Sequence, residues 1–228
     1  SSPCNPTGAF YTKKDLAGLA EVFQKHPHVF IMSDEIYEHI NFTGTHESIA
    51  SFDFLKNRVI IINGLSKGWA MTGWRLGYMA APKEIAKACD KIQGQFTSGT
   101  NAITQRAAIV ALTGDMEPTY AMVKEFRSRR KRVMELMQAI PGIECTEPAA
   151  AFYVFPRVKF FFGKSTPGGS VIKNADDLCM YLLNVAHVSV VTGKAFGEPD
   201  CIRISFANSL KNIEKGFRKI KDALADLK

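Results

Sequence analysis

The sequence has few of the features that mark secreted, membrane-spanning or fibrous proteins. Its five cysteines are widely spaced among 228 residues and form no C-x-x-C pair, so neither a disulfide framework nor a zinc ribbon is indicated. No apolar run is long enough to cross a membrane, and no signal-peptide pattern is present. The 17 glycines and 10 prolines follow no period, which excludes a collagen-like chain. The sequence therefore predicts a protein of a reducing, cytoplasmic compartment with no membrane partner.

Apolar residues are plentiful, and they make up 46% of the chain against 22% charged residues. This amount of apolar material is enough for the core of one α/β domain or of two smaller domains. The net charge of +7 is unevenly placed, because residues 1–85 hold eight basic and eight acidic residues while residues 86–228 hold 21 and 14. Such asymmetry is typical of a nucleic-acid or membrane surface, and also of an enzyme that handles anionic small molecules.

The basic run over residues 127–132 is the best candidate for nucleic-acid binding. On a helix, however, the consecutive charges of residues 129–132 point around the axis and form no single stripe. No nucleic-acid-binding motif accompanies them, so a solvated helix is the favoured interpretation and no nucleic-acid partner is predicted. The histidines at 26 and 28 have no carboxylate or cysteine at a matching spacing, and no metal site is predicted.

Three short apolar runs in the first 85 residues predict a buried sheet. The runs cover residues 29–32, 59–62 and 76–81, and the first two end abruptly in polar residues. This pattern is typical of a mostly parallel sheet, in which ligands bind beyond the carboxyl ends of the strands. A capping box at Thr12 and Asp15 predicts a helix before the first run.

Helical periodicity dominates after the third run. It predicts helices over 83–93 and 102–112 and a longer helix after Pro118. The rest of the chain is expected to form an α+β unit, with strands near 151–156, 187–191 and 202–206 and helices near 175–185 and 209–227. We therefore expect two domains, 1–115 and 116–228.

Lys67 is the most informative single residue. It follows the second apolar run and lies in the string S-K-G-W-A-M-T-G-W-R, among large apolar groups and glycines. Burial disfavours the charged form of a lysine, which leaves neutral amine for Schiff-base chemistry. The alternative is a lysine whose amine reaches the surface, which is the commoner case for an arbitrary lysine.

Asp34 and Tyr37 follow the first apolar run. A carboxylate at the end of a buried strand needs a partner, and a protonated pyridine nitrogen is one that would keep a cofactor ring an electron sink. The alternative for Asp34 is a helix cap. Tyr37, three residues on, lies where its hydroxyl can reach a ring oxygen, and a half-buried core tyrosine is its alternative.

Three further polar residues suit an anionic ligand. Asn5 belongs to the turn N-P-T-G, from which its amide can reach a ligand oxygen, although this string is also ordinary turn chemistry. Ser66 and Arg75 flank Lys67, and a hydroxyl with a guanidinium suits a phosphate. The string is not a Walker A loop, because the spacing and the residue order of that motif are absent.

Arg203 lies inside an apolar strand, on the same face as Cys201 and Ser205. Its planar guanidinium is suited to bidentate binding of a carboxylate. A solvated arginine on an edge strand is an equally good interpretation of the pattern.

Four strings together resemble the pyridoxal-phosphate-dependent aminotransferases of fold type I (class I/II). They are Asn5-Pro6-Thr7-Gly8, the S-D-E-I-Y string at 33–37, the string from Ser66 to Tyr78, and I-R-I-S-F at 202–206. Each is modest alone, whereas four in this order are specific. The strings S-D-E-I-Y and M-T-G-W-R-L-G-Y take nearly the form found in bacterial aspartate aminotransferases.

The resemblance implies an α/β fold, in which a truncated, mostly parallel sheet of the large domain precedes a C-terminal α+β small domain. It implies pyridoxal 5'-phosphate as the cofactor, with the Schiff base on Lys67, which would also move the substrate's α-proton. Asp34 would pair with the pyridinium nitrogen. Tyr37 and Asn5 would bind the phenolic oxygen of the ring.

The resemblance also implies which residues bind the cofactor phosphate and the substrate carboxylate. Ser66 and Arg75 would hold the phosphate, while Arg203, assisted by Asn5, would bind the substrate carboxylate. Residues 97–101 match a region that approaches the cofactor of a partner subunit, which implies a homodimer. Thr192 stands where the family often has proline, so the adjoining loop departs from the pattern.

The implied reaction is transfer of an amino group from an amino acid, aspartate or a similar one, to a 2-oxo acid. A C–S lyase or a synthase of the same fold type would share Lys67, Asp34 and Arg75, and a non-catalytic basic binding module is a further alternative. The family's substrate-covering arm, Gly-rich phosphate-binding segment and ring-stacking aromatic have no counterpart in the sequence. We therefore expect the C-terminal portion of an enzyme, inactive by itself.

Overall fold

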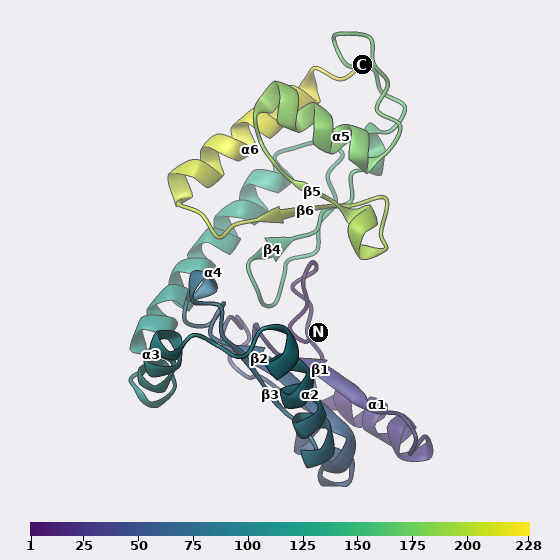
Figure 1. Ribbon diagram of the computed structural model, residues 1–228. Coiled ribbons are helices and arrows are strands. Elements are labelled where there is room, and N and C mark those ends of the chain that lie inside the picture. The colour runs from purple at the N-terminus through teal and green to yellow at the C-terminus, as the bar shows by residue number, and fades with distance from the viewer. The chain divides into compact units, whose positions relative to one another are not determined.

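The computed structural model describes all residues from 1 to 228, in two compact units (Figure 1). The N-terminal unit comprises residues 1–4, 9–123 and 149–151, and the C-terminal unit comprises residues 5–8, 124–148 and 152–228. The two units divide within helix α4 (Glu117–Gln138), so this helix contributes to both. The domain boundary expected at 115/116 lies just before this helix.

The N-terminal unit is an α/β structure built on a three-stranded sheet of order β1-β2-β3. Its elements are α1 (Lys13–Lys25), β1 (Ile31–Asp34), β2 (Val59–Gly64), β3 (Gly77–Ala80), α2 (Lys83–Phe96) and α3 (Ala102–Thr113). Strands β1 and β2 are parallel, and β3 runs antiparallel to β2. The three expected strands are thus present, and the sheet they form is mixed.

Helix α1 begins at the capping box that the sequence predicts. The Thr12 hydroxyl accepts a hydrogen bond from the Asp15 backbone N–H at 3.3 Å, and the Asp15 carboxylate accepts one from the Thr12 N–H at 2.9 Å. The buried face of the helix, Leu16 and Ala20, belongs to the same core cluster as residues of β1 and β2. Burial of an aliphatic side chain of leucine size contributes roughly 1.5–3 kcal/mol, so this packing holds the two parallel strands in place.

The C-terminal unit contains a second three-stranded sheet, of order β4-β6-β5, in which β6 pairs antiparallel with both neighbours. Its elements are β4 (Tyr153–Val154), α5 (Ala175–Tyr181), a π-helical turn (Leu182–Ala186), β5 (Val191–Thr192), β6 (Ile202–Ser205) and α6 (Leu210–Ala225). The core of this unit includes Val133 and Met137 of α4 and Phe217 of α6.

The strand predicted over residues 187–191 is wrong in its position. Helix α5 continues as the π-helical turn, which ends at His187 in the left-handed conformation with φ of 54°. The extended strand therefore starts only at Val191. None of the helices combines the length and the apolar content needed to span a membrane.

Candidate functional site

One edge of the N-terminal sheet gathers most of the predicted site residues. Asp34 pairs with Ile62 in parallel register, so β1 and β2 both leave the sheet at this edge, and antiparallel β3 starts there with Gly77 opposite Gly64. The segments after β1, after β2 and before β3 therefore lie at the same edge. These segments carry five predicted residues, namely Asp34, Tyr37, Ser66, Lys67 and Arg75.

Lys67 lies close to Tyr37. The Lys67 Nζ atom is 6.0 Å from the centre of the Tyr37 ring, and this tyrosine is only 4% exposed. The Lys67 side chain is itself half-buried. Its carbonyl accepts a hydrogen bond from the Ala70 N–H at 3.2 Å, which closes a tight turn after β2. The backbone at Lys67 is therefore part of a tight turn, and its side chain is partly shielded from solvent.

Asp34 has the local cap interaction that the sequence left as an alternative. Its Oδ1 atom accepts a hydrogen bond from the Ile36 N–H at 3.3 Å. The second carboxylate oxygen, Oδ2, takes no hydrogen bond from the chain. A half-buried carboxylate with one oxygen in use can still pair with a cation through the other.

Arg75 lines a cavity of about 550 Å³ in the N-terminal unit. Its Nη1 atom donates to the Thr72 carbonyl at 2.9 Å, and its own backbone has φ of 55°, in the left-handed region. The cavity is also lined by Thr97, Thr100 and Asn101, which lie before α3. Asn101 caps this helix through its side-chain oxygen. A guanidinium and a helix N-terminus on one cavity suit an anion.

Arg203 lies in the C-terminal unit together with Asn5. Because β6 is the central strand, the alternative of an edge-strand arginine is wrong. The guanidinium carbon is 4.7 Å from the centre of the Tyr153 ring and 4.8 Å from that of Phe196, and Nη1 donates to Asn5 Oδ1 at 2.8 Å. Since arginine only donates, the Asn5 oxygen must face it, which leaves the amide N–H groups for another acceptor.

Glu35 is a buried charged residue that the sequence analysis missed. It is 4% exposed, and its carboxylate accepts hydrogen bonds from the hydroxyls of Ser33 at 2.9 Å and Ser48 at 2.6 Å, with His46 Nε2 at 2.9 Å. Burial alone would raise the pKa of this carboxyl, but the hydrogen bonds from His46, Ser48 and Ser33 hold it below its usual value. Burial alone would lower the pKa of His46, but its hydrogen bond to Glu35 and the nearby negative charges together raise it.

Glu38 extends this polar cluster toward β2. Its Oε1 atom accepts from Asn63 Nδ2 at 2.8 Å and lies 3.1 Å from His39 Nε2. Burial favours a higher pKa for Glu38, but the hydrogen bonds from His39 and Asn63, together with the charges of His39 and His46, lower the pKa. The possible ligand atoms of Glu35, Glu38 and His46 lie within 4.8 Å of one another, and a hydrogen bond joins Glu35 to His46. The glutamates and histidines that follow Asp34 in the sequence were the pattern from which this cluster could have been predicted.

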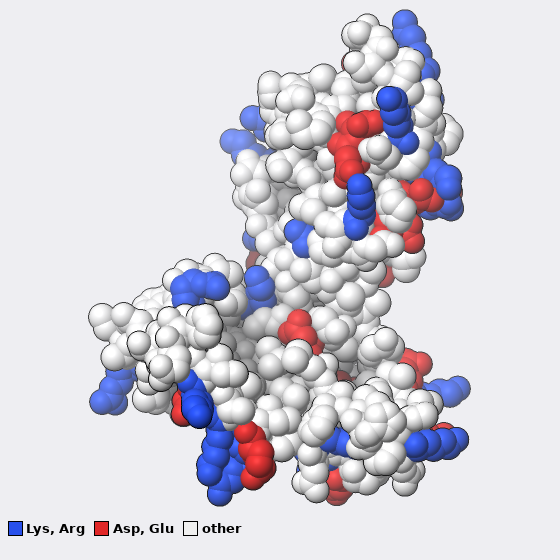
Figure 2. Space-filling view, turned by 45° about the vertical axis from the view of Figure 1, so that its right-hand side comes forward, with Lys and Arg blue, Asp and Glu red and all other residues white.

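The basic run on α4 is paired with carboxylates. Arg130 lies 3.0 Å from Glu147, and Arg132 lies 2.8 Å from Glu214. Figure 2 shows basic side chains in small groups, with acidic ones among them, on the face in view. The run is therefore a solvated, ion-paired helix surface.

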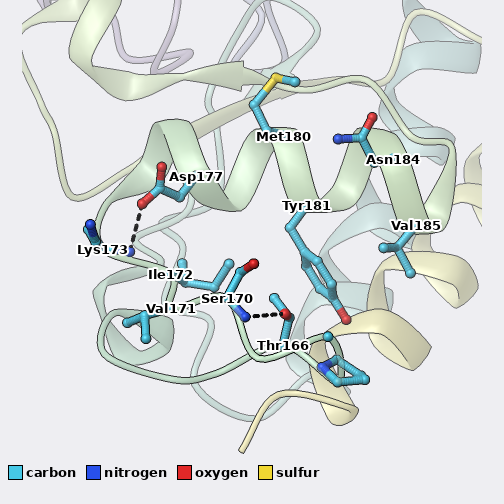
Figure 3. A pocket seen from close by; sticks show the side chains of 12 residues that line it. Thr166, Ser170, Val171, Ile172, Lys173, Asp177, Met180, Tyr181, Asn184 and Val185 are labelled. Atoms are coloured by element: carbon cyan, nitrogen blue, oxygen red, sulfur yellow. Dashed lines mark hydrogen bonds between the residues drawn. The ribbon is translucent and has the colours of Figure 1, made fainter.

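A cavity of about 750 Å³ in the C-terminal unit involves none of the predicted residues (Figure 3). It lies between α5 and the loop from Thr166 to Lys173. The Lys173 N–H donates to the Asp177 carboxylate at 2.9 Å and so fastens the end of this loop to the helix. The cavity walls combine Ile172, Met180 and other apolar groups with a few polar ones.

Comparisons with known proteins agree with these observations. The family described as "Aminotransferase class I and II" matches residues 1–220. The chain is 45% identical to a bifunctional aspartate aminotransferase and glutamate/aspartate-prephenate aminotransferase of Petunia hybrida, with 100% of this chain and 48% of the relative covered. It is 41% identical to an aspartate aminotransferase of Rhizobium meliloti, with 98% of this chain and 55% of the relative covered.

Solved structures give the same answer. The crystal structure of the Rhizobium meliloti aspartate aminotransferase matches with a TM-score of 0.95 at 41% identity, over 100% of this chain and 57% of that chain. An aromatic aminotransferase of Pyrococcus horikoshii matches with a TM-score of 0.89 at 36% identity, over 98% of this chain and 58% of that chain. The chain thus spans about half the length of these relatives. From the match over nearly all of its own length, this chain belongs to the class I and II aminotransferases.

Proposed function

We propose that this chain carries the Schiff-base lysine and the substrate-binding arginine of a pyridoxal-phosphate-dependent amino-acid aminotransferase, with aspartate or a similar amino acid as donor. The observation that carries the proposal is the common sheet edge that bears Asp34, Tyr37, Ser66, Lys67 and Arg75. The names of the relatives, which are aspartate and aspartate/prephenate aminotransferases, support this substrate class.

The donor set at this edge fits pyridoxal phosphate. An amine, a carboxylate and a phenol match the aldehyde, the pyridine nitrogen and the phenolic oxygen of the cofactor. The guanidinium of Arg75, in its cavity beside the N-terminus of α3, suits a phosphate dianion, with the Ser66 hydroxyl as a further donor. When bound, the cofactor supplies an electron-poor ring that stabilises negative charge at the substrate α-carbon.

Three residues of the N-terminal unit act on the reacting atoms. The Lys67 amine would hold the aldehyde of the cofactor, and it would also serve as the base that moves the proton of the substrate α-carbon. The Asp34 carboxylate, through Oδ2, would pair with the pyridine nitrogen and favour its protonated form. The Tyr37 hydroxyl would donate to the phenolic oxygen, and the 6.0 Å between the centre of its ring and Lys67 Nζ supports a role for both side chains at one ligand.

The substrate carboxylate is the ligand of Arg203. Its guanidinium is held by two rings and Asn5, so its donors have a fixed direction before a ligand arrives. The Asn5 amide N–H groups, which the hydrogen bond from Arg203 leaves available, would donate to the phenolic oxygen of the cofactor or to the substrate.

Borohydride reduction with pyridoxal phosphate, followed by peptide mapping, tests this proposal. We expect one pyridoxyl group, on Lys67, in the full product of the gene, and none there in Lys67→Ala. The matched control is Lys83→Ala at the exposed start of α2, which keeps the label on Lys67. A pyridoxyl group on another lysine, or on none, contradicts the proposal.

The products of aspartate turnover separate the alternatives. Amino transfer consumes a 2-oxo acid and forms its amino acid, whereas a lyase or synthase of the same fold type needs no such acceptor. A basic binding module would instead bind DNA with a steep dependence on salt. Because the chain covers about half of its relatives, we expect no transamination from residues 1–228 alone.

We also propose a homodimer. Helices α2 and α3 expose large apolar side chains, among them Phe96 at 84%, Ile103 at 72% and Val110 at 70%, and exposed apolar groups at this density mark an interaction surface. Sedimentation of the full product at a dimer mass is the expected result.

The cytoplasmic location and the domain boundary at 115/116 remain predictions, and the five unpaired cysteines support a reducing compartment.

A further inference from the structure

The backbone that follows Lys67 is held from three sides within the N-terminal unit. The Thr119 hydroxyl of α4 donates to the Gly68 carbonyl at 2.9 Å in a buried bond. The Trp69 indole N–H donates to the Ala111 carbonyl of α3 at 2.9 Å. The third side is the imidazole of His39.

His39 fits directly against this segment. A Cβ atom at Gly68 would lie 2.8 Å from His39 Cδ2, so the ring occupies the space that any side chain at 68 would need. The His39 ring also meets the Trp69 ring edge-on, with centroids 4.7 Å apart and planes at 83°. The residue after Lys67 and the next one are thus both in contact with one imidazole.

The imidazole is itself fixed by Glu38. Its Nε2 atom lies 3.1 Å from Glu38 Oε1, and the same oxygen accepts a hydrogen bond from Asn63 Nδ2 at 2.8 Å. Asn63 belongs to β2, four residues before Lys67. Glu38 therefore connects the turn after β1, which bears Tyr37, to the strand that leads to Lys67.

We propose that His39 is a positioning residue for Lys67: oriented by Glu38, its ring packs on Gly68 and Trp69 and fixes the backbone from which the lysine amine projects. The inference rests on the proposed function only in taking the Lys67 amine as the group that binds the cofactor. The contacts themselves are independent of the cofactor. His39 acts through the segment from 67 to 69.

Competitive acetylation of the cofactor-free full product tests the proposal, with mass spectrometry giving the labelling rate of Lys67 relative to exposed Lys83 across pH. In the native protein the half-buried Lys67 should label more slowly than Lys83. In His39→Ala we expect the ratio of the two rates to move toward unity by about two- to tenfold, the range that an aromatic pair of this kind supports. His39→Phe keeps the ring and should restore most of the native ratio.

His28→Ala, an exposed histidine before β1, is the matched control and should leave the ratio unchanged. An unchanged ratio in His39→Ala overturns the proposal, as does a ratio in His39→Phe as altered as in His39→Ala. If His39→Ala does not fold, Gly68→Ala displaces the ring from the opposite side and must alter the ratio. Borohydride mapping of the same variants separates the two hypotheses, because pyridoxyl on a lysine other than Lys67 contradicts the function and leaves the labelling result standing.

Discussion

Replacing Arg203 by lysine keeps the positive charge and removes the planar guanidinium. In the structure this group lies between the rings of Tyr153 and Phe196, 4.7 Å and 4.8 Å from their centres, and donates to Asn5 at 2.8 Å. A lysine ammonium reproduces the charge but not the two parallel donors. The substitution therefore separates bidentate carboxylate binding from simple charge attraction.

The magnitude follows from the hydrogen bond that is lost. A hydrogen bond to a charged group contributes about 1.5–3 kcal/mol. Loss of one of the two hydrogen bonds between the guanidinium and a carboxylate therefore raises the Kd of that ligand by roughly 10- to 150-fold. Folding stability should also decrease, because a cation–π contact contributes about 0.5–1 kcal/mol at an exposed ring and about 2 kcal/mol at a desolvated one such as the buried Tyr153 ring, although lysine retains part of both contacts.

Isothermal titration of the cofactor-loaded full product with a dicarboxylate such as succinate measures this change. Arg157→Lys is the matched control, since Arg157 is 51% exposed and pairs with Asp200 on the surface of the same unit. We expect that control to bind succinate as the native protein does. A Kd for Arg203→Lys within about twofold of the native value, well below the loss of one charged hydrogen bond, would refute the bidentate role.

The remaining predictions concern stability. The pKa of His46 is raised in the folded state, so its contribution to stability is complete below the ordinary value of 6.5 and is lost as pH rises through the folded pKa. The pKa of Glu35 is lowered, so its contribution is complete above 4.5 and does not change in this range. The Tm should therefore fall above pH 6.5 in the native protein and stay flat there in His46→Gln. Gly193→Ala should lower stability by about 1–3 kcal/mol or more, because its Cβ would overlap backbone carbonyl oxygens, whereas Gly18→Ala in open space on α1 should raise it by about 0.5–1 kcal/mol in chemical denaturation. Asn174→Ala removes the N-cap of α5 and should cost about 1 kcal/mol, or a Tm decrease of roughly 2–4 °C in calorimetry.

Much of the N-terminal unit could be predicted from local pattern. Short apolar runs with polar carboxyl ends predict parallel strands, and the structure places the ends of β1 and β2 at the same edge. The capping box at Thr12 needs only neighbours in sequence, and it was correct for the same reason. Where the determinants of structure lie within a few residues, the sequence was sufficient.

The polar cluster behind the strand ends could not be predicted in this way. Glu35 and His46 are eleven residues apart, and their pairing depends on a loop whose path no periodicity specifies. The edge or central position of Arg203 likewise depends on which strands flank β6, and β5 begins later than its apolar pattern suggests. Pairings between distant segments decide these features, and single-sequence patterns do not encode them.

The hydrogen bonds of Glu35 have a consequence for the protein without its cofactor. All the partners of this carboxylate come from the chain itself, so the turn that bears Asp34 and Tyr37 does not depend on a ligand for its order. The conformational entropy of this turn is lost during folding, and a cofactor that binds later need not offset it again. Release and rebinding of the cofactor should therefore leave this turn in a single conformation that can bind the cofactor again.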